Sequence, residues 1–156
     1  LYYYTNLLLA AISVGMWFLP VGPAYQTLWL AVIFGNSIIL GFALPLHFSL
    51  MAFADDYGEW KTGVRSSGMN FAFNLFCIKL SWASSAGIIS LLFIFVAYQP
   101  GVGNQTPASL AGITATATLL PALFHLLVAI AIRACKLNNP MMARISTDLR
   151  ARHVQS

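Results

Sequence analysis

The segment "FADDYGEWKTGVRSSG", residues 53–68, concentrates the charge of an otherwise apolar chain. The 156 residues carry eight Lys/Arg and four Asp/Glu, and this segment alone contains Asp55, Asp56, Glu59, Lys61 and Arg65. Long apolar runs lie on both sides of it. Charge is tolerated in the loops between membrane spans and is costly within them. The segment therefore predicts a loop between two membrane-spanning helices.

The composition of the whole chain agrees with a membrane protein. Hydrophobic residues make up 59% of the sequence, charged residues make up 8%, and the mean hydropathy is +0.77. A soluble domain has about 25% charged residues. So little charge cannot cover a surface that faces water, and the lipid bilayer is the expected surroundings. The net charge of +4 is interpreted as the loop bias of a membrane protein, and no nucleic-acid partner is expected.

The apolar runs predict an all-α integral membrane protein with four transmembrane helices. About 20 apolar residues cross the hydrocarbon core, and each run approaches or exceeds that length. Pro45 and Pro121 lie inside two of the runs and predict kinks there, because proline removes a backbone donor. The predicted helices are residues 1–19, 25–54, 66–98 and 108–134.

Basic residues predict the orientation of these helices. The connections after the first and third helices contain no Lys or Arg. The segment after the second helix and the C-terminal end carry Lys61, Arg65, Arg133, Lys136, Arg144, Arg150 and Arg152. By the positive-inside rule both basic segments are cytoplasmic. We therefore expect a multi-pass protein of the inner (plasma) membrane with its C-terminus in the cytoplasm.

The C-terminal residues predict a short helix outside the membrane. We divide the chain into a transmembrane portion, residues 1–137, and a cytoplasmic tail, residues 138–156. Asn139 followed by Pro140 is typical of a helix start. An apolar stripe follows at every fourth position: Met141, Ile145 and Leu149. This stripe would lie on the membrane or on the chain's own cytoplasmic loops.

Lys79 is the strongest candidate for a functional residue. It lies thirteen residues after Ser66 in an apolar run, roughly 20 Å along the helix and near the bilayer midplane. A cation there costs at least ~2.5 kcal/mol and must face water or an acidic partner. Asn74 and Trp82 flank it on the same run. An ammonium, an amide and an indole together suit a sugar, with donors for hydroxyls and a flat apolar face for the ring.

Two other kinds of membrane protein remain open from these residues alone. His47 and His125 lie on the second and fourth predicted helices and could hold a haem in a redox-complex anchor. The chain could also be a structural membrane subunit whose charged segment docks a partner. No GxSxG, HExxH or P-loop motif is present, so we expect no enzyme activity, no metal and no cofactor.

At "DYGEWKTGVR" the sequence resembles a known family. This string, followed fourteen residues after Arg65 by an intramembrane lysine, is similar to the glycoside–pentoside–hexuronide:cation symporters. These are the melibiose permease group of the major facilitator superfamily. The "QTPASLAGI", "LLPALFHLL" and "RISTDLRARH" segments also resemble its C-terminal end. Melibiose permease has an acid at the position of Phe53, whereas the extra acid here is Asp55.

The resemblance implies a transporter. Family members have twelve helices, so these four would be the last four, and the remainder of the transporter would be a partner. This agrees with a chain that starts at Leu1 inside an apolar run. The implied activity is transport of a sugar or glycoside coupled to Na⁺ or H⁺ by alternating access.

The resemblance places Lys79 and Asn74 near the sugar, and Trp82 is expected beside them. It places Asp56 and Arg65 in a cytoplasmic gate, which we expect to include Glu59 and Lys61. The coupling cation would bind mainly to the N-terminal half.

Overall fold

The computed structural model describes residues 1–135 and 139–155, and the regular elements in this part of the chain are all helices. The all-α prediction is confirmed. In chain order they are α1 (Tyr2–Trp17), the short 3-10 helix η1 (Pro23–Tyr25), α2 (Gln26–Thr62), α3 (Ser67–Phe95), α4 (Pro107–Ala134) and α5 (Asn139–Gln155).

Three of these helices are long and apolar enough to cross a membrane. They are α2 together with η1, α3 and α4, with mean hydropathies of 2.0, 1.7 and 2.1 over their most apolar windows. The fourth predicted span corresponds to α1, which has 16 residues. A helix of that length covers about 24 Å, less than the ~30 Å thickness of the hydrocarbon core. Length and composition thus identify three spans in the described residues.

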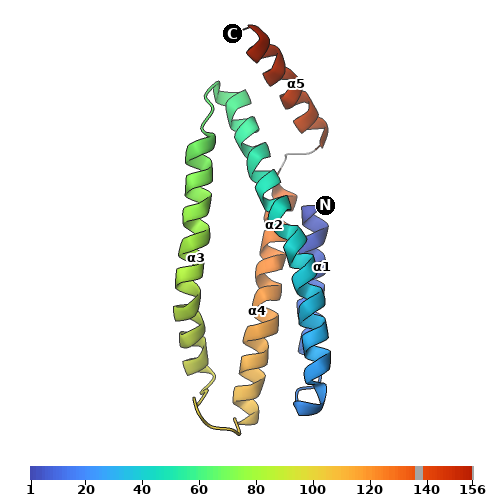
Figure 1. Ribbon diagram of the computed structural model, residues 1–156, viewed down its shortest axis with the longest axis vertical. Helices are drawn as coiled ribbons and strands as arrows, with labels where there is room; N and C mark the ends of the chain where they lie inside the picture. The colour runs from blue at the N-terminus through green and yellow to red at the C-terminus, as the bar shows by residue number, and fades with distance from the viewer. Residues whose placement is uncertain (136–138, 156) are drawn as a thin grey trace.

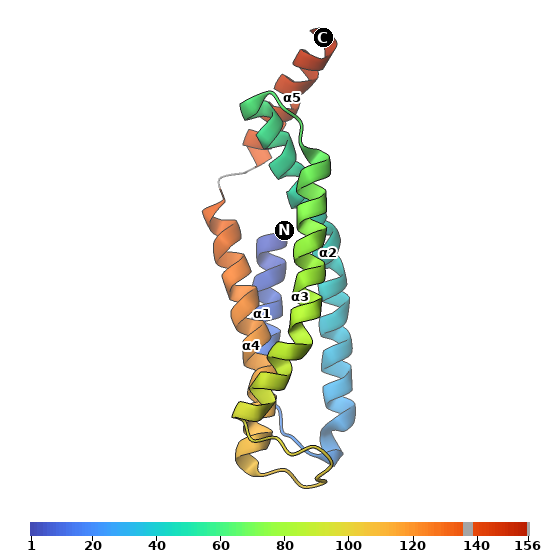
Figure 2. The same cartoon turned by 90° about the vertical axis from the view of Figure 1, so that its left-hand side faces the viewer.

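The helices alternate in direction along one long axis. Figure 1 shows α1 and α3 running one way, and α2 and α4 running the other. Both views place the end of α2, the turn into α3 and the helix α5 at one end of the molecule (Figures 1 and 2). The segment that joins α3 to α4 lies at the opposite end. The end of α2, which carries Lys61, therefore lies at the same end of the molecule as α5, which carries Arg144, Arg150 and Arg152.

The best-packed interface of the chain lies between α1 and α4. Small side chains permit close approach of two membrane helices, because dispersion contacts grow as the backbones draw together. Ala10 on α1 is 2% exposed, and Ala122 and Ala129 on α4 are equally buried. Leu9 on α1 and Thr118 on α4 are completely buried. These contacts fix the position of α1 against α4.

The helix α2 is longer than the sequence predicts. Its predicted end was residue 54, but the helix continues through the charged residues to Thr62. Gly63 then adopts φ 73°, a left-handed conformation that suits glycine, and its N–H donates to the Glu59 carbonyl across 2.8 Å. With 37 residues, α2 spans about 55 Å and exceeds the membrane thickness. The charged segment is thus a projecting helix end with a short turn.

The tail forms the predicted helix, α5, starting at Asn139. The predicted domain boundary between residues 137 and 138 lies outside the described residues. Ile145 is fully buried and Leu149 is 7% exposed, and α5 packs against α2. Its buried apolar residues therefore face the packing of α5 on α2.

Candidate functional site

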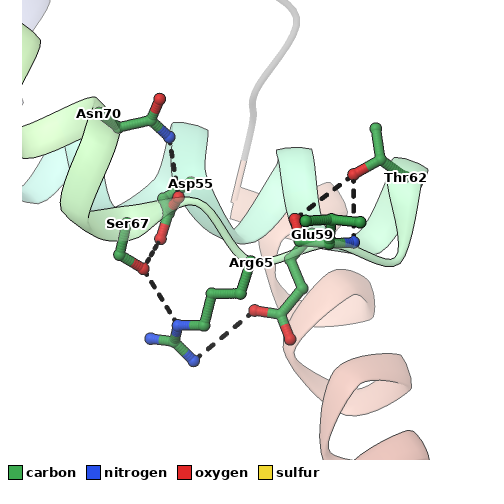
Figure 3. Close-up of polar contacts among 7 residues, drawn as sticks. Asp55, Glu59, Thr62, Arg65, Ser67 and Asn70 are labelled. Atoms are coloured by element: carbon green, nitrogen blue, oxygen red, sulfur yellow. Dashed lines mark hydrogen bonds and ion pairs between the residues drawn. The ribbon is translucent and has the colours of Figure 1, made fainter.

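Asp55 is the centre of a polar network between α2 and α3. Its side chain is 4% exposed, and its carboxylate accepts hydrogen bonds from two side chains in the first turns of α3. The Ser67 hydroxyl donates to Oδ2, and the Asn70 amide donates to Oδ1 across 2.8 Å. A buried carboxylate needs such donors, because it has lost its water. The projecting end of α2 is held to α3 at this point (Figure 3).

Arg65 extends this network to Glu59. The guanidinium Nε donates to the Ser67 hydroxyl across 3.0 Å, while Nη1 lies 3.6 Å from Glu59 Oε2. Figure 3 shows Arg65 reaching from the turn between the two acids. The Arg65 side chain is 61% exposed, so this ion pair is worth at most about 1 kcal/mol. The ion pair is easily broken, whereas the Asp55 contacts are buried. We call Asp55, Glu59, Arg65, Ser67 and Asn70 the Asp55 network.

The structure separates the four predicted gate residues. Glu59 and Arg65 come together in the Asp55 network. Lys61 lies outside it, with Nζ 5.9 Å from the centroid of the Tyr57 ring. Asp56 is half-buried, and within residues 1–135 and 139–155 its carboxylate makes no hydrogen bond or ion pair. Sequence reasoning singled out Asp56 and missed Asp55, because only the fold shows which acid faces α3.

A second contact joins the end of α2 to α5. The Trp60 indole donates to Asp148 Oδ2 across 2.9 Å, and Arg152 Nη1 donates to the Trp60 carbonyl across 3.2 Å. Ile145 and Leu149 are buried beside these polar contacts. The same stretch of α2 is thereby held by α3 on one side and by α5 on the other. The sequence does not indicate a contact between Trp60 and Asp148, because the two residues are 88 positions apart.

The three predicted sugar contacts are divided between two environments. Asn74 faces α2, where its amide contacts the His47 ring. Lys79 and Trp82 are exposed, and Trp82 is 74% exposed. In the part of the chain that the structure describes, the Lys79 ammonium makes no hydrogen bond or ion pair. The helix that carries all three, α3, has no buried residue along its described length.

Asn74 lines an open cavity between α2 and α3 whose wall includes three polar side chains, those of Ser66, Asn70 and Asn74. The cavity has a volume of about 500 Å³ and extends from Gly58 and Ser66 near the charged end to Asn74 and Cys77. Asn70 of the Asp55 network also lines it. Amide and hydroxyl groups on this wall can bind sugar hydroxyls, and Phe73 adds an apolar ring. The cavity therefore connects the Asp55 network with the predicted sugar contact.

The two membrane histidines contact different helices. His47 on α2 pairs with Asn74 on α3, whereas His125 on α4 contacts Asn6 on α1. His125 Nδ1 lies 3.1 Å from Asn6 Oδ1, and the Asn6 amide donates to the Tyr2 carbonyl across 3.0 Å. Each imidazole thus contacts a side-chain amide on a neighbouring helix. No group of three metal-binding side chains occurs in the described residues.

Comparison with known proteins settles the family. The family model for MFS/sugar transport proteins matches residues 1–139. The chain belongs to this family. The resemblance to the glycoside–pentoside–hexuronide:cation symporters is confirmed, and the haem-anchor alternative is not favoured. The family and the apolar helices indicate a multi-pass inner-membrane protein, and the members of this family are transporters.

Individual relatives point in the same direction. The inner membrane symporter YicJ of Escherichia coli (strain K12) is 34% identical over 130 residues, which cover 83% of this chain and 28% of YicJ. A provisionally assigned sulfoquinovose importer of Salmonella typhimurium is 28% identical over 85% of this chain and 29% of its own length. An uncharacterized 29.9 kDa protein of Pseudescherichia vulneris is 28% identical over 92% of this chain and 52% of its own. No solved structure matches the chain significantly. This chain thus spans between 28% and 52% of the length of these relatives.

Proposed function

We propose that this chain is the C-terminal part of a transporter that moves a sugar or glycoside together with Na⁺ or H⁺. The family and the relative named a symporter support this assignment. The small share of the relatives that it covers supports its being one part of a longer protein. The rest of the transporter would supply most of the ligands for the coupling cation. Alternating access would then arise from movement of this part against the other.

We also propose the orientation of the helices. In this proposal α1 is a fourth span that is short for the bilayer and is supported by its packing on α4. The end of α2, the turn at Gly63 and the helix α5 lie in the cytoplasm. Seven of the eight Lys/Arg residues belong either to the charged segment after the second span or to the C-terminal end of the sequence. The positive-inside rule favours a cytoplasmic position for both segments. The Asp55 network would then be part of the cytoplasmic gate.

The observation that carries the proposal is the position of Lys79. It lies twelve residues into α3, about 18 Å from the helix start, and is exposed on a helix without buried residues. A lysine at that depth needs water or an anionic partner. In a transporter both are available, since the cation-binding carboxylates and the substrate meet in the central cavity. Trp82, one turn further, would offer its ring to the sugar.

The direct test is uptake by the whole transporter with Lys79 replaced. Membrane vesicles would be supplied with radiolabelled methyl glycosides and a C6-sulfonated sugar, under an imposed Na⁺ or H⁺ gradient. The sulfonated sugar is included because one relative is named for sulfoquinovose. We expect Lys79→Ala to abolish or severely impair gradient-driven uptake. Arg150→Ala is the matched control, because Arg150 is an exposed cation on α5. Uptake by Lys79→Ala at the rate of the unmodified transporter would overturn the proposal.

A further inference from the structure

An open cavity lies between α1 and α4, near the start of α1 and the end of α4. Its volume is about 420 Å³, within the range of ~300–1,000 Å³ that ligand cavities have. Both views show the start of α1 beside the end of α4 (Figures 1 and 2). The Asp55 network and the cavity at Asn74 lie between α2 and α3 instead. The cavity between α1 and α4 is therefore separate from the candidate gate and sugar contacts.

The walls of this cavity are apolar side chains that recur along one face of each helix. On α1, Tyr3 and Leu7 are four residues apart, so they lie on the same face one turn apart. On α4, Leu126 and Ile130 have the same spacing, and their side chains are 40% and 64% exposed. Such walls offer carbon contacts along two turns of helix and few hydrogen bonds. They suit a hydrocarbon chain better than a sugar.

A cation lies at the end of this apolar cavity. Among the described residues that line it, Arg133 is the charged one, and it is exposed in the last turn of α4. Within residues 1–135 and 139–155 its guanidinium makes no hydrogen bond or ion pair. A guanidinium is always charged in proteins, and its planar fork of N–H donors matches a phosphate group. The cavity thus combines apolar walls with a phosphate-binding side chain.

The position of Arg133 along α4 matches the level of lipid headgroups. The uncharged run from Leu110 to Ile132 directly precedes it. As a helix this run is about 34 Å long, close to the ~30 Å thickness of the hydrocarbon core. Tyr3 also lines the cavity, and tyrosine is enriched where a membrane meets water. A lipid headgroup at Arg133 would therefore have its acyl chains beside the apolar walls.

We propose that this cavity binds one anionic phospholipid, with its phosphate on Arg133 and an acyl chain between α1 and α4. Charge complementarity selects the headgroup, because a zwitterionic lipid carries a second cation near its phosphate and Arg133 repels that cation. The bound chain would join the short helix α1 to α4. The inference goes beyond the proposed function and takes from it only that this end of α4 faces the cytoplasm. Basic pockets between membrane helices on that side bind anionic headgroups in other proteins.

The first experiment locates the lipid on the whole transporter. Liposomes of phosphatidylcholine receive a trace of phosphatidylglycerol with a photoactivatable diazirine in one acyl chain. A parallel sample receives phosphatidylethanolamine with the same chain. After irradiation, the labelled peptides are identified by mass spectrometry. We expect phosphatidylglycerol to label residues 3–7 and 126–134 more strongly than phosphatidylethanolamine does. Equal labelling by both lipids would refute selection by Arg133. If neither lipid labels these residues, the rest of the transporter or a second copy covers the cavity, and the proposal is wrong.

The second experiment measures affinity at this site, as displacement of the photoactivatable lipid by unlabelled phosphatidylglycerol. Arg133→Gln should weaken binding by about tenfold, the effect of one charge-assisted hydrogen bond, with little change for phosphatidylethanolamine. Arg133→Lys should retain part of the affinity, because lysine keeps the charge without the planar fork. Arg150→Gln is the matched control, since it removes an exposed cation from α5. An equal loss in Arg150→Gln, or no loss in Arg133→Gln, overturns the site.

Two further arms separate the acyl chain from the headgroup. Ala134 is exposed and lines the cavity, so Ala134→Phe should fill part of it and weaken the binding of both lipids. Soluble glycerol phosphate has the phosphate but no chain, and an excess of it should not displace the lipid. Displacement by glycerol phosphate would indicate a site for phosphate alone and would contradict the proposal.

The lipid site and the proposed function can fail independently, because none of these measurements needs a sugar. If Lys79→Ala transports normally while phosphatidylglycerol still labels the cavity, the proposed function is wrong and the lipid site stands. If Lys79→Ala abolishes uptake while the cavity is not labelled, the lipid site alone is wrong.

Discussion

The Trp60 indole on α2 donates a 2.9 Å hydrogen bond to the Asp148 carboxylate on α5. This bond and the Arg152 contact to the Trp60 carbonyl join two helices that the sequence separates by the whole of α3 and α4. Buried Ile145 and Leu149 complete the contact. The end of α2 is consequently the meeting point of α3 and α5.

Removing the Trp60 donor should release α5. Trp60→Phe keeps an aromatic ring but leaves Asp148 without its indole partner. A hydrogen bond to a charged group contributes about 1.5–3 kcal/mol, and partial exposure places this one at the lower end. We expect amide hydrogen exchange across α5 to accelerate by about tenfold, measured by mass spectrometry of the whole transporter.

A second tryptophan on α2 provides the control. The Trp29 indole donates to the Pro20 carbonyl across 3.0 Å, at the far end of the same helix. Trp29→Phe removes an indole hydrogen bond there and should leave exchange in α5 unchanged. Equal protection of α5 in Trp60→Phe and the unmodified protein would show that apolar packing alone holds this helix.

Replacing Asp55 should weaken the contact between α2 and α3 more than replacing its neighbour Asp56. Asp55→Ala strands the Ser67 hydroxyl and the Asn70 amide in a partly buried site, at a cost of about 1–3 kcal/mol. Asp56→Ala removes a half-buried carboxylate without a described partner. We expect faster hydrogen exchange in the first turns of α3 for Asp55→Ala alone. Faster exchange in Asp56→Ala, together with unchanged exchange in Asp55→Ala, would contradict the role given to the Asp55 network.

The sequence predicts the helices better than their contacts. Apolar runs identify α2, α3 and α4, because lipid requires about 20 apolar residues per span. The helical state of residues 55–62 was not predicted, since a charged stretch after a membrane run resembles a loop. The glycine at residue 63, which adopts the left-handed conformation that ends the helix, is the local signal that could have indicated this boundary.

Partners far apart in the chain lie beyond sequence reasoning. Asn6 and His125 are 119 residues apart, and nothing local to either predicts their contact. His47 and Asn74 were each noticed, one as a possible haem ligand and one as a sugar contact, but their pairing follows from the packing of α2 on α3. A sequence can indicate single candidate residues, whereas contacts between distant residues depend on tertiary structure.

The Asn6–His125 contact should couple α1 to α4 energetically. Asn6 is 3% exposed, so its amide must find partners within the protein. A double-mutant cycle with Asn6→Leu and His125→Phe isolates their interaction. Hydrogen bonds between membrane helices contribute about 0.6 kcal/mol on average and up to about 1.7 kcal/mol. We expect a coupling energy in that range from unfolding in mixed micelles. The same cycle with Asn6 and His47 should give no coupling, and additive effects of Asn6→Leu and His125→Phe would show that the contact does not stabilise the fold.

Gly112 should be intolerant of any side chain. A Cβ atom built at this position would lie 2.4 Å from Cγ1 and 2.6 Å from Cβ of Val96, which caps the end of α3. A change of valine rotamer cannot move its Cβ, so the ends of α3 and α4 would have to separate. We expect Gly112→Ala to cost about 1–3 kcal/mol, the usual range for overpacking, and to lower the midpoint of thermal unfolding in detergent. Gly87→Ala on α3 is the control, because a Cβ there meets nothing within 4 Å and alanine favours the helix. Val96→Gly should restore the stability of Gly112→Ala, and a Gly112→Ala protein as stable as the original would show that α3 and α4 do not meet at this point.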